Sequence, residues 1–272
     1  MPGCSTSLFP NTACGCRIRG ELELSVKSAE LEKTDRLSLL FRAAQDQALG
    51  VVVVLEGTGL PGIIYTVEEL SSCLDPRHFE VHHFPGAETA PERKDLFLHH
   101  YWLNLPRYGD LAVFDGSYYH DWAVRKSANK LGNSESRNWI EDINNFEHGL
   151  HQNRYLVLKI RIQRDRKDLQ EEMDTDKRLK IWSPLLGKRA KYLIKHHKEY
   201  SEALELVVEN TNVPDAPWFT PPPEKGKHVR AHVLDYLIAR LEEALSVDSR
   251  QAVASYDEAM ALMRNLKSEA SQ

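Results

Sequence analysis

The stretch that decides the fold runs from residue 51 to residue 62 and reads Val51-Val52-Val53-Val54-Leu55-Glu56-Gly57-Thr58-Gly59-Leu60-Pro61-Gly62. Its five consecutive apolar residues predict a strand that is buried on both faces, as in a parallel sheet. Residues 56–62 then read as a glycine-rich turn, and apolar residues through Val67 and Leu70 predict a helix after it. A strand, a glycine-rich turn and a helix form the frame of a phosphate-binding loop, in which backbone N–H groups and the start of the helix face the anion.

Strands and helices alternate along the rest of the chain. Short apolar runs predict further strands at residues 79–84, 111–115, 155–160 and 218–219. The helical spacing of apolar residues predicts helices within residues 37–48, 91–103, 139–150, 184–208 and 229–241. This alternation predicts an α/β fold, a parallel sheet with helices on both faces, whose ligands bind outside the carboxyl ends of the strands. We therefore expect residues 56–62 and Asp115 to lie at one edge of the sheet.

Composition and charge exclude several classes of protein. The chain has 272 residues, of which 42% are hydrophobic and 28% are charged, as in soluble globular proteins. With 35 basic and 40 acidic residues the net charge is −5, so we expect no nucleic-acid partner. The most apolar run, residues 51–55, is far shorter than the roughly 20 residues that cross a bilayer, and no secretory signal is visible. These features predict a cytoplasmic protein with no membrane partner.

Three segments lie outside the alternating pattern. Residues 1–20 read as a flexible tail that contains three cysteines, Cys4, Cys14 and Cys16. The pair Cys14 and Cys16 is either half of a metal site or, because no second pair at zinc-site spacing follows, two reduced thiols. Residues 164–182 are dominated by charge without a core pattern, which predicts a mobile helical lid or a solvated helix. Residues 248–272 predict a C-terminal amphipathic helix.

Asp115 is the first candidate for chemistry. It ends the apolar run of residues 111–114, and a carboxylate at the end of such a strand commonly holds Mg²⁺. The alternative is that Asp115 caps the helix that follows. A second metal arrangement would join Asp115 to His120 and Asp121, against the reading of His120 as an ordinary surface histidine.

A basic run follows the strand at residues 155–160. It consists of Arg161, Arg164, Arg166 and Lys167. These residues are candidates for contacts with an anion, and the alternative is that they form the solvated face of a helix.

Six segments resemble the polyphosphate kinase 2 family, in the order and spacing that the family has. Residues 56–65 match the family loop, which reads EGRDAAGKGG in family members, and residues 114–121 match its later FDRSWYNR segment. The other four match LNPRG-like, YxxxLP-like, KRWKLSP-like and APW elements and lie at residues 74–77, 101–106, 177–184 and 216–218. The resemblance covers residues 33–245.

The resemblance implies a P-loop domain over residues 33–247, with a three-layer P-loop kinase-like fold and a charged helical lid. Family members transfer phosphate between polyphosphate and nucleotides with Mg²⁺, and they form dimers or tetramers. A nucleotide, polyphosphate, Mg²⁺ and further subunits are therefore the ligands and partners that the resemblance implies. The remnant of the phosphate-binding loop would consist of Glu56, Gly57, Thr58, Gly59, Gly62 and Ile63.

The sequence departs from the family chiefly by losing positive charge. The loop arginine, aspartate and lysine and two later arginines are replaced by Thr58, Gly59, Ile63, Gly116 and Asp121. By the same register the lid arginine falls on Glu171. Phosphoryl transfer depends on positioning and on neutralised charge, and one cation at the transferred group can be worth on the order of 10³-fold in rate. We also expect the branched side chains of Ile63 and Ile64 to fill the space of the phosphates.

Three functions follow as hypotheses. The first is a non-catalytic binding or scaffolding subunit with a degenerate phosphate-binding loop, in a homo- or hetero-oligomer. The alternative is an active polyphosphate:nucleotide phosphotransferase that uses Asp115 with Mg²⁺ and takes its cations from the basic run at residues 161–167. The third is a binding protein whose neutral pocket is lined by Tyr65, Tyr118 and Tyr119.

Overall fold

The five strands form one parallel sheet in the computed structural model, which describes residues 20–84 and 96–250. They are β1 (Gly50–Glu56), β2 (Phe79–His83), β3 (Leu111–Asp115), β4 (Tyr155–Arg161) and β5 (Trp218–Phe219). Their order across the sheet is β2-β3-β1-β4-β5, and every neighbouring pair is parallel. The predicted parallel sheet is confirmed.

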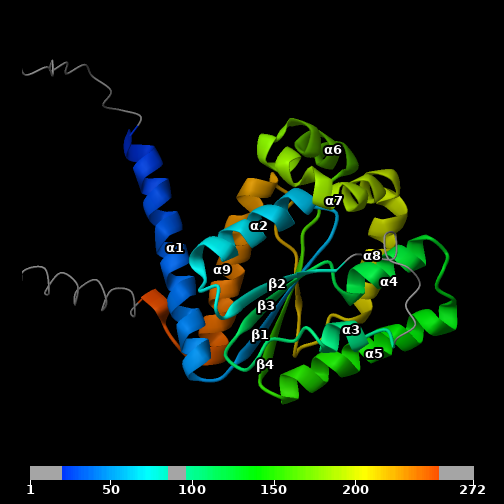
Figure 1. Cartoon of the computed structure of the whole chain (residues 1–272), viewed down its shortest axis with the longest axis horizontal. Coiled ribbons are helices and arrows are strands. Elements are labelled where there is room, and N and C mark those ends of the chain that lie inside the picture. Colours follow the sequence, from blue (N-terminus) through cyan, green and yellow to red (C-terminus); the bar gives the residue numbers. More distant parts are fainter. Residues whose placement is uncertain (1–19, 85–95, 251–272) are drawn as a thin grey trace, which may run out of the picture.

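Helices cover both faces of this sheet (Figure 1). The helices of the described residues are α1 (Gly20–Asp46), α2 (Leu60–Cys73), α3 (His99–Trp102), α4 (Tyr118–Ser127), α5 (Asn133–Gln152), α6 (Arg166–Thr175), α7 (Lys177–Lys195), α8 (His197–Asn210) and α9 (Gly226–Leu245). Helices α1, α2 and α9 lie on one side of the sheet, α4, α5 and α8 lie on the other, and α6 and α7 lie above the carboxyl ends of the strands. The result is the predicted three-layer architecture with a helical lid.

The core consists of two apolar clusters, one on each face of the sheet. Every residue of β1 is buried, as its continuous apolar run predicts. Because successive side chains of a strand point to opposite faces, Val51 and Val53 enter the cluster beneath α1, α2 and α9, which we call the α9-side cluster. Val52 and Val54 enter the cluster beneath α4, α5 and α8, which we call the α4-side cluster.

The register of the strands brings the predicted site residues to one edge of the sheet. Leu55 of β1 pairs with Asp115 of β3, and Glu56 pairs with Arg161 of β4. The ends of β1 and β3 therefore lie side by side at the carboxyl ends of the strands, beneath α6 and α7. The expectation that residues 56–62 and Asp115 share this edge is confirmed.

Some predicted elements differ from the observed ones. The single helix expected at residues 184–208 is divided into α7 and α8, because the backbone of His196, with φ −113° and ψ 32°, leaves the helical region. The helix expected at residues 91–103 is confirmed only as the short α3, since residues 85–95 lie outside the described part. The tail, its cysteines Cys4, Cys14 and Cys16, and nearly all of the helix expected at residues 248–272 also lie outside the described residues. In the part of the chain that the structure describes, no helix is both long and apolar enough to span a membrane.

Candidate functional site

The turn after β1 is shorter than the sequence predicts. Helix α2 begins at Leu60, so that Leu60, Pro61 and Gly62 form its first turn and only residues 57–59 connect it to β1. Proline is well suited to the first turn of a helix, where its missing N–H group would have no partner in the helix. The expected glycine-rich turn over residues 56–62 is therefore wrong in its second half.

This short turn is packed directly against the chain that continues β4. The N–H group of Gly59 donates to the carbonyl oxygen of Ile162 at 2.8 Å, and the N–H group of Ile162 donates to the carbonyl oxygen of Glu56 at 2.7 Å. Gly57 has a φ of +123°, and a Cβ atom there would overlap the backbone of Ile162. Glycine is required at position 57 by this close approach and by this backbone conformation.

Further polar groups of the turn are also bonded within the protein. The Thr58 hydroxyl donates to the carbonyl oxygen of Arg164 at 2.9 Å and accepts from the N–H group of Arg164 at 2.9 Å. The N–H group of Leu60 donates to Thr58, and that of Ile63 donates to Gly59. In a phosphate-binding loop such N–H groups point at the anion. Here the N–H groups of Gly59, Leu60 and Ile63 bond to the chain itself.

Ile63 and Ile64 do not fill the space above the turn, as the sequence had led us to expect. Ile63 is fully buried in the α9-side cluster, and Ile64 packs in the α4-side cluster. The reason is that α2 begins three residues before position 63, so both side chains already point from the helix into the core.

Asp115 is held by two basic side chains. It is 8% exposed, its Oδ1 lies 2.6 Å from Nη1 of Arg189 on α7, and its Oδ2 lies 2.9 Å from Nδ1 of His83 on β2. Burial opposes ionisation of this carboxyl, but Arg189 and His83 outweigh burial and lower its pKa to about 2. Asp115 does not cap α4, because Ser117 is the cap and accepts from the N–H group of Tyr119 at 3.2 Å.

These contacts determine whether the Asp115 carboxylate is free to bind a metal ion. Mg²⁺ needs carboxylate oxygens that are free to enter its coordination shell. Both oxygens of Asp115 are already bonded to cationic or basic groups, and the described residues contain no group of three or more His, Cys, Asp or Glu side chains able to hold a metal. The residues present do not fit Mg²⁺.

The second metal arrangement is wrong as well. His120 Nδ1 lies 2.9 Å from the Tyr200 hydroxyl in the α4-side cluster, and Asp121 is paired with Arg125 at 3.1 Å. His120 is 1% exposed, so it is not a surface histidine either. Its Nδ1 atom is bonded to a core tyrosine.

The basic run after β4 is divided between paired and exposed residues. Arg161 is paired with Glu205, and Arg164 is paired with Glu172 at 2.6 Å and with Asp168 at 3.2 Å. Arg166 and Lys167 are exposed in the first turn of α6, without an ion-pair partner in the described segments. The two residues nearest the strand ends therefore have their charge balanced by carboxylates.

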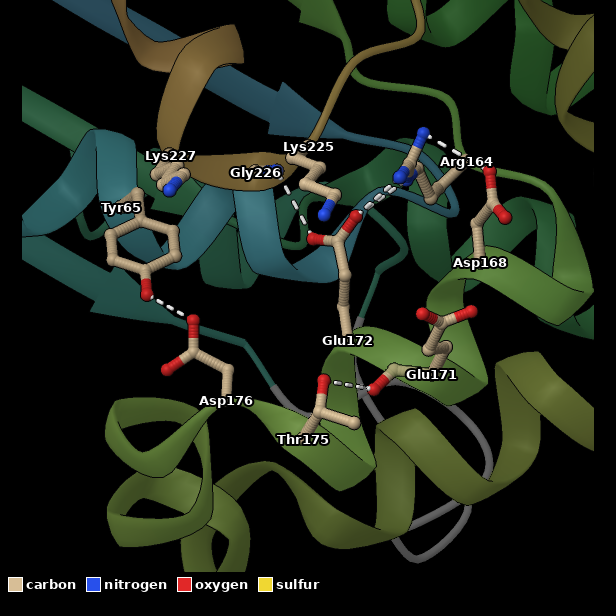
Figure 2. A pocket seen from close by; sticks show the side chains of 10 residues that line it. All are labelled: Tyr65, Arg164, Asp168, Glu171, Glu172, Thr175, Asp176, Lys225, Gly226 and Lys227. Atoms are coloured by element: carbon tan, nitrogen blue, oxygen red, sulfur yellow. Dashed lines mark hydrogen bonds and ion pairs between the residues drawn. The ribbon is translucent and has the colours of Figure 1, made fainter.

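A pocket of 220 Å³ lies between α2, α6 and the start of α9, and we call it the lid pocket (Figure 2). Its charged lining is formed by Arg164, Lys225 and Lys227 and by the carboxylates Asp168, Glu171, Glu172 and Asp176. Glu172 points from α6 toward α9 and accepts from the N–H group of Gly226 at 3.1 Å. The start of a helix attracts anions, and at α9 a side chain of the protein already supplies one.

The lid is anchored to the core, contrary to the expectation that residues 164–182 lack a core pattern. Leu169 of α6 and Leu179 of α7 are fully buried in the α4-side cluster. The Tyr65 hydroxyl donates to Asp176 between these helices, and burial, followed by this bond, raises the pKa of Tyr65 to about 12. Two leucines among many charges gave too weak a periodic signal for the sequence to reveal this.

The tyrosines at positions 118 and 119 do not line a pocket with Tyr65. Both hydroxyls donate to Glu147, at 2.7 and 2.6 Å, and Glu147 is paired with the buried Lys159 at 2.6 Å. Burial, and then the charge of Glu147, raises the pKa of both tyrosines. Only Tyr65 lines the lid pocket, so the predicted neutral pocket of three tyrosines is wrong.

Arg189 is the residue that sequence reasoning missed. It lies in a charge-rich part of α7, 74 residues after Asp115, and nothing in its local sequence marks a contact with the sheet. Gly116, with a φ of +70°, permits this contact, because a Cβ atom there would lie 3.1 Å from Nη1 of Arg189. A residue without a side chain directly after Asp115 was the available signal.

The fold defines the class of protein. A parallel sheet with helices on both faces, a strand-turn-helix unit at its carboxyl edge and a helical lid form a P-loop kinase-like fold. The crystal structure of polyphosphate kinase 2 from Arthrobacter aurescens has the same fold, with a TM-score of 0.69 and 20% sequence identity over 87% of each chain.

The chain belongs to the polyphosphate kinase 2 family, whose model matches residues 22–249. It is 25% identical over 79% of its length to the polyphosphate:AMP phosphotransferase of Pseudomonas syringae, of which it spans 43%. It is 28% identical over 80% of its length to the AMP/ADP-polyphosphate phosphotransferase of Meiothermus ruber, of which it spans 80%.

Proposed function

We propose that this chain keeps the fold of polyphosphate kinase 2 without its phosphoryl transfer and acts as a non-catalytic binding or scaffolding subunit. The observation that carries the proposal is the closed turn after β1. The N–H group of Gly59 and the Thr58 hydroxyl bond to the chain that continues β4, the N–H groups of Leu60 and Ile63 bond within the turn, and its glycines are packed against Ile162. A polyphosphate chain at this turn would have to displace backbone rather than solvent.

The balance of charge supports the same proposal. Catalysis of phosphoryl transfer consists largely of positioning and charge neutralisation, for which cations must face the phosphates. At the strand ends Arg161, Arg164 and Arg189 are paired with carboxylates, and in the lid pocket four carboxylates lie against three basic side chains. A polyanion would gain little attraction there, because its own charge competes with the carboxylates for the same cations.

A phosphotransfer assay tests the proposal. The purified full chain is incubated with Mg²⁺ and polyphosphate and with AMP, ADP or GDP, and the Meiothermus ruber relative serves as the positive control. We expect no turnover above buffer. Turnover that Asp115→Asn abolishes, in a variant whose circular dichroism matches that of the wild type, would overturn the proposal.

The subunit role has a separate test. Sedimentation equilibrium of the full chain gives a mass to compare with the 31.1 kDa of one copy. We expect a larger mass, from a homo-oligomer or from a complex with another protein. A single copy at every concentration, in material that carries no other protein, contradicts the scaffolding role.

The second candidate is an active phosphotransferase that acts on polyphosphate and a nucleotide. It is favoured by the relatives, which are named as phosphotransferases, and by Asp115, which ends β3 where the family motif has its aspartate. Thermal unfolding with ligand separates the two candidates, because a ligand at 100 times its dissociation constant stabilises a protein by about 2.7 kcal/mol. A shift with polyphosphate or a nucleotide favours this second candidate, and no shift favours the first.

A further inference from the structure

Arg189 is buried at the carboxyl ends of the strands with only part of its guanidinium bonded. The side chain is 4% exposed, and Nη1 contacts Asp115 at 2.6 Å. Its Nε and Nη2 atoms have no hydrogen-bond partner among the described residues. A buried guanidinium that makes so few hydrogen bonds is held chiefly by charge.

The charge that faces Arg189 comes from two buried carboxylates on neighbouring strands. Glu56 is fully buried at the end of β1, accepts from the N–H group and hydroxyl of Ser117 with Oε1, and has no partner for Oε2 in the described residues. Burial opposes the charged form of Arg189, but Asp115 and then Glu56 outweigh it and raise the pKa of the guanidinium. The Arg189 guanidinium is therefore ion-paired with Asp115, which His83 also contacts, and its charge acts on the neighbouring Glu56 as well.

The surroundings of Arg189 keep it in this place. Ala190 and Leu193, which follow it on α7, are buried in the α4-side cluster and fix the helix above the strand ends. On the sheet side Gly116 leaves the room that the guanidinium occupies. The packing of α7 and the absence of a side chain at Gly116 thus place the Arg189 guanidinium against Asp115.

We propose that the Arg189 guanidinium is a built-in cation that takes the place of a divalent metal at Asp115 and Glu56 and fastens α7 over the strand ends. This inference rests on the proposed function, for which it supplies the reason that Asp115 takes no metal. It predicts that a divalent cation binds once the guanidinium is removed, because Asp115 and Glu56 are then left without the charge of Arg189 and only His83 still contacts Asp115. Its tests measure stability and metal binding rather than turnover, so either proposal can fail without the other.

A double-mutant cycle tests the counter-charge. Arg189→Gln leaves Asp115 buried without its cation, and we expect the melting temperature to fall by about 10 °C. In Arg189→Gln/Asp115→Asn the lone charge is gone, so much of the loss should be recovered. The control Arg240→Gln removes a partly exposed arginine paired with Glu243 at 2.8 Å and should leave the melting temperature nearly unchanged. If Asp115→Asn does not rescue Arg189→Gln, or if neither variant folds, the proposal is wrong.

Mn²⁺ binding, measured from the electron paramagnetic resonance signal of the free ion, tests whether Arg189 takes the place of a metal. We expect no binding at Asp115 in the wild type, so that the wild type and Asp115→Asn bind alike. Arg189→Gln should gain one bound Mn²⁺ per chain, and Arg189→Gln/Asp115→Asn should lose it again. Wild-type binding that Asp115→Asn removes would overturn the proposal, and so would a folded Arg189→Gln protein that gains no Mn²⁺.

Discussion

Both the backbone conformation and the packing at position 57 require glycine. Its positive φ is a conformation that side chains with a Cβ atom rarely adopt, and its position against Ile162 leaves no room for one. The same glycine would suit an open phosphate-binding loop equally well, which is why the sequence alone did not distinguish an open loop from a closed turn. The two differ in what the glycine packs against, and here it packs against the backbone after β4.

Gly57→Ala should therefore destabilise the protein by about 2 kcal/mol or more, since the backbone of Ile162, which follows β4, has to move as well as the turn. Urea unfolding measures the change. The matched control is Gly149→Ala in the last turn of α5, where no atom lies within 4 Å of the added Cβ, and this variant should be stabilised by up to about 1 kcal/mol. Equal effects of the two substitutions would contradict the packed turn.

Asp115 should make the free energy of unfolding depend on pH in the acid range. Its pKa of about 2 in the folded protein lies below the value of about 3.9 in the unfolded chain. A carboxyl with a lowered pKa stabilises the fold above pH 4, and this stabilisation is lost as the pH falls toward 2. The amount is about 2 to 3 kcal/mol, from 1.36 kcal/mol for each unit of pKa.

Urea unfolding at pH 6, 4 and 3 compares the wild type with Asp115→Asn. The asparagine variant should lose less stability on acidification than the wild type, because its side chain cannot take up the proton. Asp235→Asn, at a half-exposed aspartate paired with Lys33, provides the control and should follow the wild type. Parallel curves for all three proteins would show that Asp115 is not held by its basic neighbours.

At the scale of the element, the sequence predicted strands better than helix ends. Strand β1 was recognisable because burial on both faces demands an unbroken apolar run, and residues 111–114 of β3 show the same pattern. In β4 the apolar run is interrupted by Lys159, which is buried and paired with Glu147. The start of α2 was missed because glycine and proline usually mark turns, whereas Pro61 here stands in the first turn of a helix. The break between α7 and α8 at His196 has no glycine or proline to announce it.

The lid helix α6 is held over the turn by ion pairs as well as by Leu169. Arg164 connects the chain after β4 to Glu172 and Asp168, and Glu172 in turn accepts from Gly226 of α9. Arg164 is largely buried, with its side chain 12% exposed, so its ion pairs are shielded from water more than a pair on the surface is. Arg164 and Glu172 therefore connect α6 to the chain after β4 and to the start of α9.

Arg164→Gln should loosen α6, and hydrogen exchange of the α6 amides measures the effect. We expect faster exchange over residues 166–175 and little change in β1, because α6 can open without unfolding the sheet. Arg178→Gln is the control, since the Arg178 side chain is 63% exposed and its pair with Glu68 is a surface pair. A uniform increase across the whole chain would instead mean that α6 opens only with global unfolding.

At the scale of the whole molecule, one sheet carries both apolar clusters. Alternate residues of β1 belong to opposite clusters, so neither cluster can separate without moving the central strand. Trp122 lies in the α4-side cluster, and Trp139 and Trp218 pack against it, so tryptophan fluorescence reports mainly on that side. Leu237 of α9 lies in the α9-side cluster.

Leu237→Ala therefore tests whether the two sides unfold together. The cavity should cost about 2 to 5 kcal/mol. We expect the urea midpoint to fall by the same amount when it is followed by tryptophan fluorescence and by circular dichroism, because one sheet links the clusters. A fluorescence midpoint that stays at the wild-type value would show that the α4-side cluster persists alone.

The site was less predictable than the fold, for a physical reason. The place of Asp115 followed from the parallel sheet, because carboxyl ends of parallel strands meet at one edge. Its partners did not follow, since Arg189 and His83 come from other elements and only packing brings them together. The pairing of Arg161 and Arg164 with carboxylates was likewise invisible in a list of charges.

The burial of Ile63 has a consequence for any attempt to repair the loop. On paper, Ile63→Lys restores the family residue in one step. In the fold, the new ammonium would enter the cluster that contains Leu37, Val53 and Leu70, and burying it without a partner costs several kcal/mol. Reversion would first require the backbone to take a different path into α2, and no single codon change supplies that path.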